Sequence, residues 1–155
     1  FYNFSTREIQ YDAVAFHPAG VAISAEQTFL NVGTSDGVFG YSFRIAEDGG
    51  LDFGQEYIHY HIPYGSTGAG VSGMTIDAEN LLYSATPLGV QVSDQLGRVN
   101  FIFSKPAEGV LDVKLGGIDF DTLYLSCNGR LFSRKIKAKG ILSWQSPVKP
   151  PKPGL

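Results

Sequence analysis

The sequence contains a single cysteine, Cys127, among its 155 residues. One cysteine cannot form an internal disulfide, so the stability of the chain has to come from packing and hydrogen bonds. Cys127 ends the strand-like run TLYLSC, and a cysteine in such an apolar run is usually a small buried residue. We therefore expect Cys127 in the core rather than in a reactive site.

Charged side chains are also scarce. They make up 17% of the residues, below the roughly 25% of an average globular domain. The 15 Asp and Glu outnumber the 12 Lys and Arg, and the net charge of −3 argues against a nucleic-acid partner, which selects a basic face. No apolar run approaches the ~20 residues of a membrane-spanning helix, so no membrane partner is expected either.

Histidine is limited to three residues, and two of them, His59 and His61, are two positions apart in the strand-like run EYIHYHI. Side chains at this spacing share one face of a strand. A zinc site needs at least a third ligand, which the sequence does not supply nearby, so we interpret the pair as surface or cavity-lining residues. Asp119 and Asp121 also share a face, but they lie in a turn, where Asp is expected for structural reasons.

Glycine and aromatic residues are abundant instead. Nineteen glycines and 13% aromatic residues are typical of strands joined by tight turns. Three segments, 20–45, 73–94 and 112–136, repeat the order strand, polar turn, strand, glycine turn, strand. Such units recurring about every 40–50 residues predict propeller blades. The predicted strands are 21–24, 28–33, 38–43, 56–62, 74–77, 81–86, 90–94, 113–116, 122–127 and 130–136.

One segment of the second repeat, residues 78–85 (AENLLYSA), is rich in helix-forming residues. The equivalent residues of the other repeats, 28–33 and 122–127, are rich in strand formers, so we predict strands in all three. The predicted fold is therefore all-β: about three four-stranded antiparallel blades in one partial propeller domain, residues 1–142. A proline-rich tail, residues 143–155, follows, either as a plain extended end or as a ligand for a proline-recognising domain.

Two glycine motifs match known signatures but have the wrong predicted context. Gly68-x-Gly70-x-x-Gly73 has the spacing of a dinucleotide-binding turn, and residues 33–37 match the G-x-S-x-G nucleophile elbow. Both motifs need a helix after the turn, whereas here a strand is predicted after each. We predict instead that the glycines of 65–73 let a loop pass close to neighbouring backbone at the propeller axis.

Residues 17–33, 71–99 and 116–140 together resemble the last three blades of the SMP-30/gluconolactonase/LRE-like family, and 73–92 is the most specific part. The resemblance implies half of a six-bladed β-propeller and an activity of the calcium- or zinc-dependent lactonase or carboxylic-esterase type. In that family one cation on the propeller axis is held by a Glu, an Asn and an Asp. The metal polarises the lactone carbonyl and activates water, with the Asp as base.

Two family ligands fall on positions of this chain where the residue differs. The Asn position is occupied by Ala19 and the Asp position by Ser72, so no confident metal ligand remains and calcium or zinc is implied by the family alone. The resemblance makes Ser72 the candidate catalytic residue. The candidate substrate-lining residues are Pro18, Ala19, Gly20, His59, His61, Gly73 and Met74.

Six blades of roughly 45 residues need about 270, and this chain has 155. Half a propeller leaves two blade faces without a neighbour, so we expect a partner: the missing N-terminal half, or a second copy that closes the ring. A small lactone or sugar-derived molecule is the implied ligand. Bacterial members of the family are often exported, which favours a periplasmic or extracellular location. Two functions stay open, a lactonase-like hydrolase and a non-catalytic propeller for binding or assembly.

Overall fold

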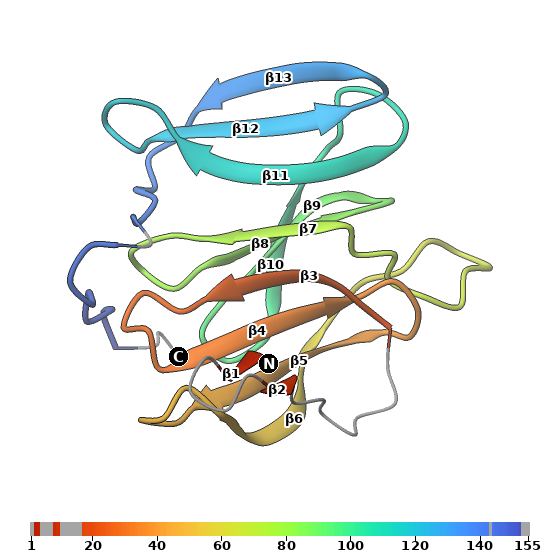
Figure 1. Ribbon diagram of the computed structural model, residues 1–155. Helices are drawn as coiled ribbons and strands as arrows, with labels where there is room; N and C mark the ends of the chain where they lie inside the picture. Colours follow the sequence, from red (N-terminus) through yellow and green to blue (C-terminus); the bar gives the residue numbers. More distant parts are fainter. Residues whose placement is uncertain (1, 4–7, 10–16, 143, 153–155) are drawn as a thin grey trace.

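The computed structural model describes residues 2–3, 8–9, 17–142 and 144–152. Three antiparallel sheets, here called blades 1, 2 and 3, are stacked face to face with blade 2 in the middle (Figure 1). A separate pair, β1 (Tyr2–Asn3) and β2 (Glu8–Ile9), precedes them. The all-β fold class and the propeller-blade arrangement predicted from the sequence are confirmed. The described residues contain no helix long and apolar enough to cross a membrane.

Each blade is a meander in which strands neighbouring in sequence also pair in space. Blade 1 contains β3 (Pro18–Ile23), β4 (Phe29–Thr34), β5 (Phe39–Ile45) and β6 (Leu51–His59). Blade 2 contains β7 (Gly73–Ile76), β8 (Leu82–Thr86), β9 (Gly89–Ser93) and β10 (Val99–Phe103). Blade 3 contains β11 (Val110–Gly116), β12 (Thr122–Cys127) and β13 (Arg130–Lys135).

The first three strands of each blade match the sequence prediction closely, and the fourth does not. β6 begins at Leu51, five residues before the predicted start, and ends at His59 rather than at residue 62. β10 was not predicted, and blade 3 has three strands within the described residues rather than four. Most side chains of β6 and the middle of β10 are exposed, so these outer strands lack the apolar alternation that marks a half-buried strand.

The core has two parts, one between each pair of neighbouring blades. Interface 1–2 is formed by Ala22, Ile58, Tyr60, Ala69, Val71, Met74, Ile76 and Leu82. Interface 2–3 is formed by Tyr83, Ala85, Val90, Val92, Val113, Leu123, Leu125 and Cys127. Cys127 is fully buried, which confirms the prediction of a core cysteine.

Glycines let the chain approach itself closely at interface 1–2. A Cβ atom added to Gly33 would lie 2.4 Å from Val71 Cγ1, and one added to Gly68 would lie 2.8 Å from the Asp36 backbone. Gly70 has a φ of +60° and packs on the Pro87 ring. The predicted close passage of the loop is confirmed at these positions. Strand β7 follows the glycines, so the helix that a dinucleotide site needs is not there.

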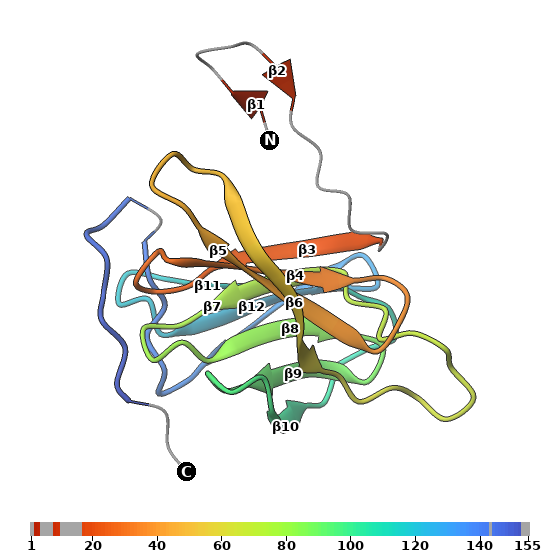
Figure 2. The ribbon, with the colours of Figure 1, turned by 90° about the horizontal axis from the view of Figure 1, so that it is seen from below.

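The loop after β6 and the C-terminal tail lie at opposite ends of the strands (Figures 1 and 2). The tail contacts turns of blades 1 and 2: Val148 N donates to Ala25 O at 2.9 Å, and Gln95 Nε2 donates to Pro151 O at 2.9 Å. The division of the chain into a propeller domain, 1–142, and a tail, 143–155, stays a prediction.

Candidate functional site

The innermost strands β3, β7 and β11 lie side by side and begin at the same end of the stack. A Cβ on Gly20 would lie 3.0 Å from Met74 Cγ, and a Cβ on Gly73 would lie 2.0 Å from Asp112 Oδ1. The two motifs that the sequence analysis proposed as parts of one site therefore contact each other. We call the group Pro18–Gly20, Ser72–Met74 and Asp112 the inner-strand mouth.

Asp112 is the carboxylate at this mouth, and the sequence analysis did not single it out. Its Oδ1 accepts a hydrogen bond from Val113 N at 2.7 Å and lies 3.3 Å from Lys114 Nζ. Lys114 Nζ also donates to Met74 O at 2.7 Å, which ties β11 to β7. Both charged side chains are about half exposed, so water and a small substrate can reach them.

The remaining mouth residues offer few polar atoms. The Ser72 hydroxyl donates to Ala85 O at 3.4 Å, and Ser72 N donates to the same oxygen at 3.0 Å. Ala19 is exposed and its methyl group has no ligand atom. Ser72 and Gly73 are thus held against blade 2 by backbone and hydroxyl contacts, while Asp112 supplies the charge.

The mouth residues do not fit a divalent cation. A calcium site needs several oxygen ligands with more than one negative charge. Here the carboxylate is Asp112, and the Lys114 ammonium already lies beside it. In the part of the chain that the structure describes, no three His, Cys, Asp or Glu side chains gather to hold a metal.

The structure places His59 and His61 at the outer side of blade 1. The His59 ring stacks on Phe39 with 5.0 Å between centroids, and the His61 backbone is held by Gln91, whose Oε1 accepts from His61 N at 2.9 Å. Tyr60 between them is buried, so the two histidines share an exposed face. They come from the outermost strand and the loop after it, and no hydrogen bond or ring contact among the described residues joins them to the mouth. Their role in lining a substrate stays a prediction.

A second polar pair beside the mouth was also missed by the sequence analysis. His17 Nδ1 lies 2.6 Å from Asp36 Oδ2, and His17 directly precedes Pro18. The hydrogen bond to His17 lowers the pKa of Asp36. Ala69 N donates to Gly37 O at 2.7 Å, which brings the loop before Ser72 against this turn.

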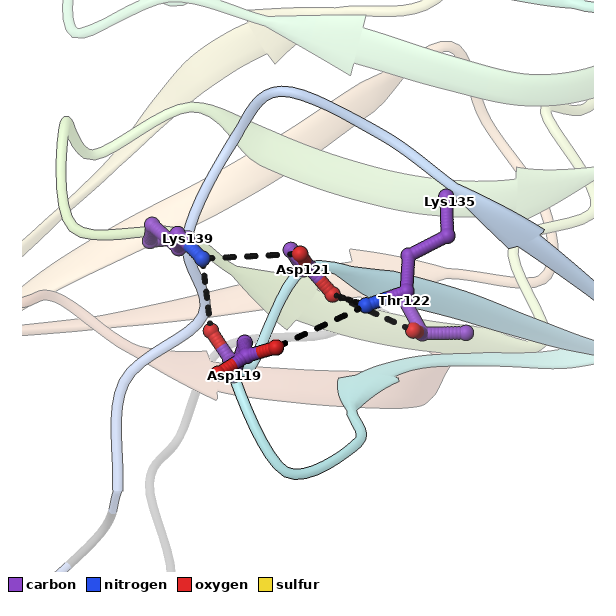
Figure 3. A network of polar contacts seen from close by, with 5 residues as sticks. All are labelled: Asp119, Asp121, Thr122, Lys135 and Lys139. Carbon is purple, nitrogen blue, oxygen red and sulfur yellow. Dashed lines mark hydrogen bonds and ion pairs between the residues drawn. The ribbon is translucent and has the colours of Figure 1, made fainter.

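Asp119 and Asp121 have the structural role that their turn position predicted. Both pair with lysines that follow in the chain: Lys135 contacts Asp119 and Asp121, and Lys139 contacts Asp121 (Figure 3). The hydrogen bond from Lys135 lowers the pKa of Asp121, although the pair is exposed. This network joins the β11–β12 turn to the end of β13, away from the mouth.

Solved structures with a similar fold include two enzymes and a calcium-binding protein. The chain is similar to a gluconolactonase from Xanthomonas campestris, with a TM-score of 0.66 and 22% identity over 80% of this chain and 39% of that one. It is similar to the calcium-binding protein regucalcin from Agrobacterium tumefaciens, with a TM-score of 0.69 and 19% identity over 81% and 48%. A luciferin-regenerating enzyme gives a TM-score of 0.68 and 18% identity over 86% and 48%.

These structures confirm, at the level of the fold, the resemblance to the SMP-30/gluconolactonase/LRE-like family. The chain spans less than half the length of each of these proteins. No protein-family model matches the sequence, and no curated protein matches it either.

Proposed function

We propose that this chain is part of a β-propeller hydrolase of the lactonase or carboxylic-esterase type, with its reacting centre at the inner-strand mouth. The observation that carries the proposal is the side-by-side start of three innermost strands, with Asp112 of β11 against Gly73 of β7, in a fold shared with a gluconolactonase. The absence of a side chain at Gly73 lets the Asp112 carboxylate lie directly against the β7 backbone. The Asp112 side chain is about half exposed, so a small ring can approach it from solvent.

In the proposed reaction Asp112 acts as the general base. It accepts a proton from a water molecule while the water oxygen bonds to the lactone carbonyl carbon. The tetrahedral intermediate then breaks the bond between the carbonyl carbon and the ring oxygen. The proton passes from Asp112 to the departing ring oxygen, which yields the open hydroxy acid. The Lys114 ammonium lies 3.3 Å from Asp112 Oδ1, beside the proposed base.

No step is assigned to calcium or zinc, because the mouth residues do not fit a divalent cation. The two positions that the family resemblance marks as ligands, Ala19 and Ser72, supply no charge. Ser72 is accordingly proposed as a positioning residue that holds the loop on Ala85, and not as a base.

The second candidate function is a non-catalytic propeller that binds a ligand or assembles with a partner. It is favoured by the uncharged residues at positions 19 and 72 and by the pairing of Asp112 with Lys114. A non-catalytic module does not need a carboxylate that acts as a base, so an Asp112 that is paired with Lys114 is compatible with this function.

The proposed partner is an N-terminal half rather than a second copy. Blade 1 presents Val21 and Ile23, which are 59% and 48% exposed, on its outer face. Blade 3 presents Tyr124, Leu131 and Ser133 on its outer face, and Leu131 is 85% exposed. Two copies closing a ring would press these unlike faces together, whereas a different half can complement each of them.

The test is hydrolysis of D-glucono-δ-lactone and phenyl acetate by the purified protein, with EDTA, calcium or zinc added. We expect turnover, and Asp112→Asn should lower kcat/KM by about 10²- to 10⁴-fold. Asp119→Asn is the matched control, because that carboxylate pairs with a lysine away from the mouth. Equal activity of Asp112→Asn and the control would contradict Asp112 as the base.

Absence of turnover on both substrates would overturn the hydrolase and leave the binding module. In that case the double variant Ala19→Asn/Ser72→Asp should gain calcium or zinc affinity that the unchanged protein lacks, measured by titration calorimetry. Tight calcium binding by the unchanged protein would contradict the binding module as described.

A further inference from the structure

Interface 1–2 is not filled along its whole length. Near the end that carries the tail it contains a cavity of about 200 Å³. Blade 1 contributes walls from β4, β5 and β6, and blade 2 contributes walls from the turns after β7 and β9. We call it the interblade cavity, lined among others by Glu26, Phe29, Asn31, Ser42, Tyr57 and Asp94.

Two buried polar side chains in this cavity have no protein partner. Asn31 and Ser42 are opposite each other on β4 and β5, and are 8% and 7% exposed. Neither side chain makes a hydrogen bond to another residue within the described part of the chain. Other buried polar groups at this interface are paired, for example the Tyr60 hydroxyl with Ser84 Oγ at 2.9 Å, whereas Ser93 Oγ on β9 is buried without a hydrogen-bond partner among the described residues. The polar atoms of Asn31 and Ser42 open onto the cavity, where water or a ligand can make the hydrogen bonds that the protein does not make.

Contacts between the blades hold the cavity in shape on two sides. Asn80 Nδ2 donates to Glu26 Oε2 at 2.6 Å, and Asn80 Oδ1 accepts from Ala25 N at 2.6 Å. At the outer strands the Tyr57 hydroxyl donates to Gln95 O. These contacts fix the separation of the two blades, so a ligand would meet a preformed site and lose little affinity to reorganisation.

The lining groups define the chemistry of the ligand. The Asn31 amide donates and accepts, the Ser42 hydroxyl does both, and the carboxylates accept. Arg98 neutralises Asp94 at 2.8 Å, whereas no ion pair within the described residues neutralises Glu26, so an anion is disfavoured. The rings of Phe29 and Tyr57 are partly exposed and offer flat apolar surfaces. A ligand with alternating hydroxyl and C–H groups matches this lining, because its hydroxyls can bond the polar side chains and its C–H groups can pack on the rings.

The size of the cavity agrees with one small ring molecule. At about 30 Å³ per water, 200 Å³ corresponds to about seven water molecules, the volume that a six-membered polyol displaces. The cavity is also separate from the inner-strand mouth. β3 starts at the mouth with Pro18 and ends at Ile23, beside the cavity residue Ser24, a span of about 16 Å at ~3.3 Å per residue.

We propose that the interblade cavity binds one neutral polyhydroxylated molecule, a monosaccharide or a cyclitol, through Asn31 and Ser42. The inference does not rest on the proposed hydrolase, because its site and its groups are different. Its readout is binding at the cavity, so a failure of lactone hydrolysis leaves it unaffected.

The experiment is a titration of the ¹⁵N-labelled protein with myo-inositol and with D-glucose, followed by NMR. We expect a saturable shift of the Asn31 side-chain amide signals with at least one of the two probes. Asn31→Leu should weaken binding at least tenfold and Ser42→Ala severalfold, while Ser133→Ala on the exposed face of β13 should not change it. If Asn31→Leu does not fold, the affinity of Ser42→Ala for the two probes tests the proposal.

Several outcomes would overturn the proposal. No saturable shift with either probe would mean that the cavity holds water only. Unchanged affinity in both Asn31→Leu and Ser42→Ala would place the bound sugar elsewhere. Tighter binding of methylammonium or of gluconate than of the neutral probes would show that charge, and not hydroxyl groups, is recognised.

Discussion

Interface 2–3 and interface 1–2 join the same central blade to its two neighbours, but they are formed by different kinds of residues. Interface 2–3 is a continuous set of buried side chains from the facing strands, including Val92, Leu125 and Cys127. Interface 1–2 relies on glycines such as Gly33, on a loop that crosses back between the blades, and on polar pairs such as Tyr60 with Ser84. Buried apolar side chains stabilise both interfaces, and interface 1–2 depends in addition on the close fit of its glycines and on its polar pairs.

The proposed sites follow the same division. The inner-strand mouth lies at one end of interface 1–2, with Asp112 reaching across from blade 3, and the interblade cavity lies near the other end. A dry interface of interlocked apolar side chains leaves no room for a ligand, whereas one built on glycines and polar groups leaves space at its margins. Variants in the two interfaces should therefore differ in the size and the kind of their effects.

The largest loss of stability is expected from Leu125→Ala in interface 2–3. Leu125 is 8% exposed, and removing its side chain leaves a cavity that should lower the free energy of unfolding by about 2–5 kcal/mol. Leu131→Ala is the matched control, because Leu131 is 85% exposed and its loss should stay within about 0.5 kcal/mol. Urea denaturation followed by fluorescence measures both, and equal losses would refute the assignment of a dry core here.

In interface 1–2 the corresponding test is a substitution that adds one methyl group at a close contact, rather than one that removes a side chain. Gly33→Ala places a methyl group 2.4 Å from Val71 Cγ1 and 2.8 Å from Met74 Sδ, which should lower the free energy of unfolding by about 1–3 kcal/mol. Gly116→Ala is the control, since its added carbon would meet Tyr124 at an ordinary 3.4 Å. Denaturation curves should show partial recovery in Gly33→Ala/Val71→Ala. No recovery would mean that the fit to Val71 is not the cause.

Tyr60→Phe tests the polar part of interface 1–2. The change removes the hydroxyl that pairs with Ser84 Oγ and leaves that oxygen buried without a partner, a loss of about 1–3 kcal/mol in stability. Adding Ser84→Ala should restore most of the loss. Burial raises the pKa of Tyr60 to about 12, so its ionisation in an absorbance titration should appear only at strongly alkaline pH. Ionisation near pH 10 would contradict its burial.

The smallest effect concerns a charge at the edge of interface 2–3. Burial raises the pKa of Asp77 above its ordinary value, although hydrogen bonds from Leu81 N and the Tyr83 hydroxyl oppose this shift. A carboxyl group with a raised pKa in the folded state binds more protons there than in the unfolded chain. Its contribution to stability is thus present at acid pH and is lost as the pH rises from about 4 through the raised pKa.

Comparison with Asp77→Asn isolates that contribution, because the asparagine does not titrate. The difference in the free energy of unfolding between the original protein and the variant should fall as the pH rises through this window. Other titrating groups contribute equally to both proteins and cancel. A difference that grows with pH would mean that the hydrogen bonds outweigh burial at this carboxyl.

The first three strands of each blade could be predicted from the sequence because they occur in the same order in three repeated segments. Residues 78–85 favour a helix in isolation, yet alignment with two other repeats predicted a strand at 81–86, and β8 covers residues 82–86. The first half of β6 and all of β10 could not be found in this way. Their side chains are largely exposed, and an exposed strand lacks the period of two that burial imposes.

The sites depend on contacts between distant residues, which a strand pattern does not contain. Asp112 meets Gly73 from 39 positions away, although its place at the start of the third repeat, where the other two have Gly20 and Gly73, was an available signal. Asn31 and Ser42 gave no signal. Asn31 and Ser42 are polar residues of strands in which polar and apolar residues alternate, so the sequence predicts that they face solvent. They are buried because blade 2 packs over that face of blade 1.

The contacts of the tail have a mechanical consequence. After leaving blade 3, the chain runs beside the turns of the other blades, where Val148 N donates to Ala25 O of blade 1 and Pro151 O accepts from Gln95 Nε2 of blade 2. A force applied at the C-terminus therefore acts first on the hydrogen bonds between the tail and the turns of blades 1 and 2. It acts on blade 3 only after these hydrogen bonds have broken. Under tension the contact with blade 2 at Pro151 should part first, the contact with blade 1 at Val148 second, and blade 3 should unfold last.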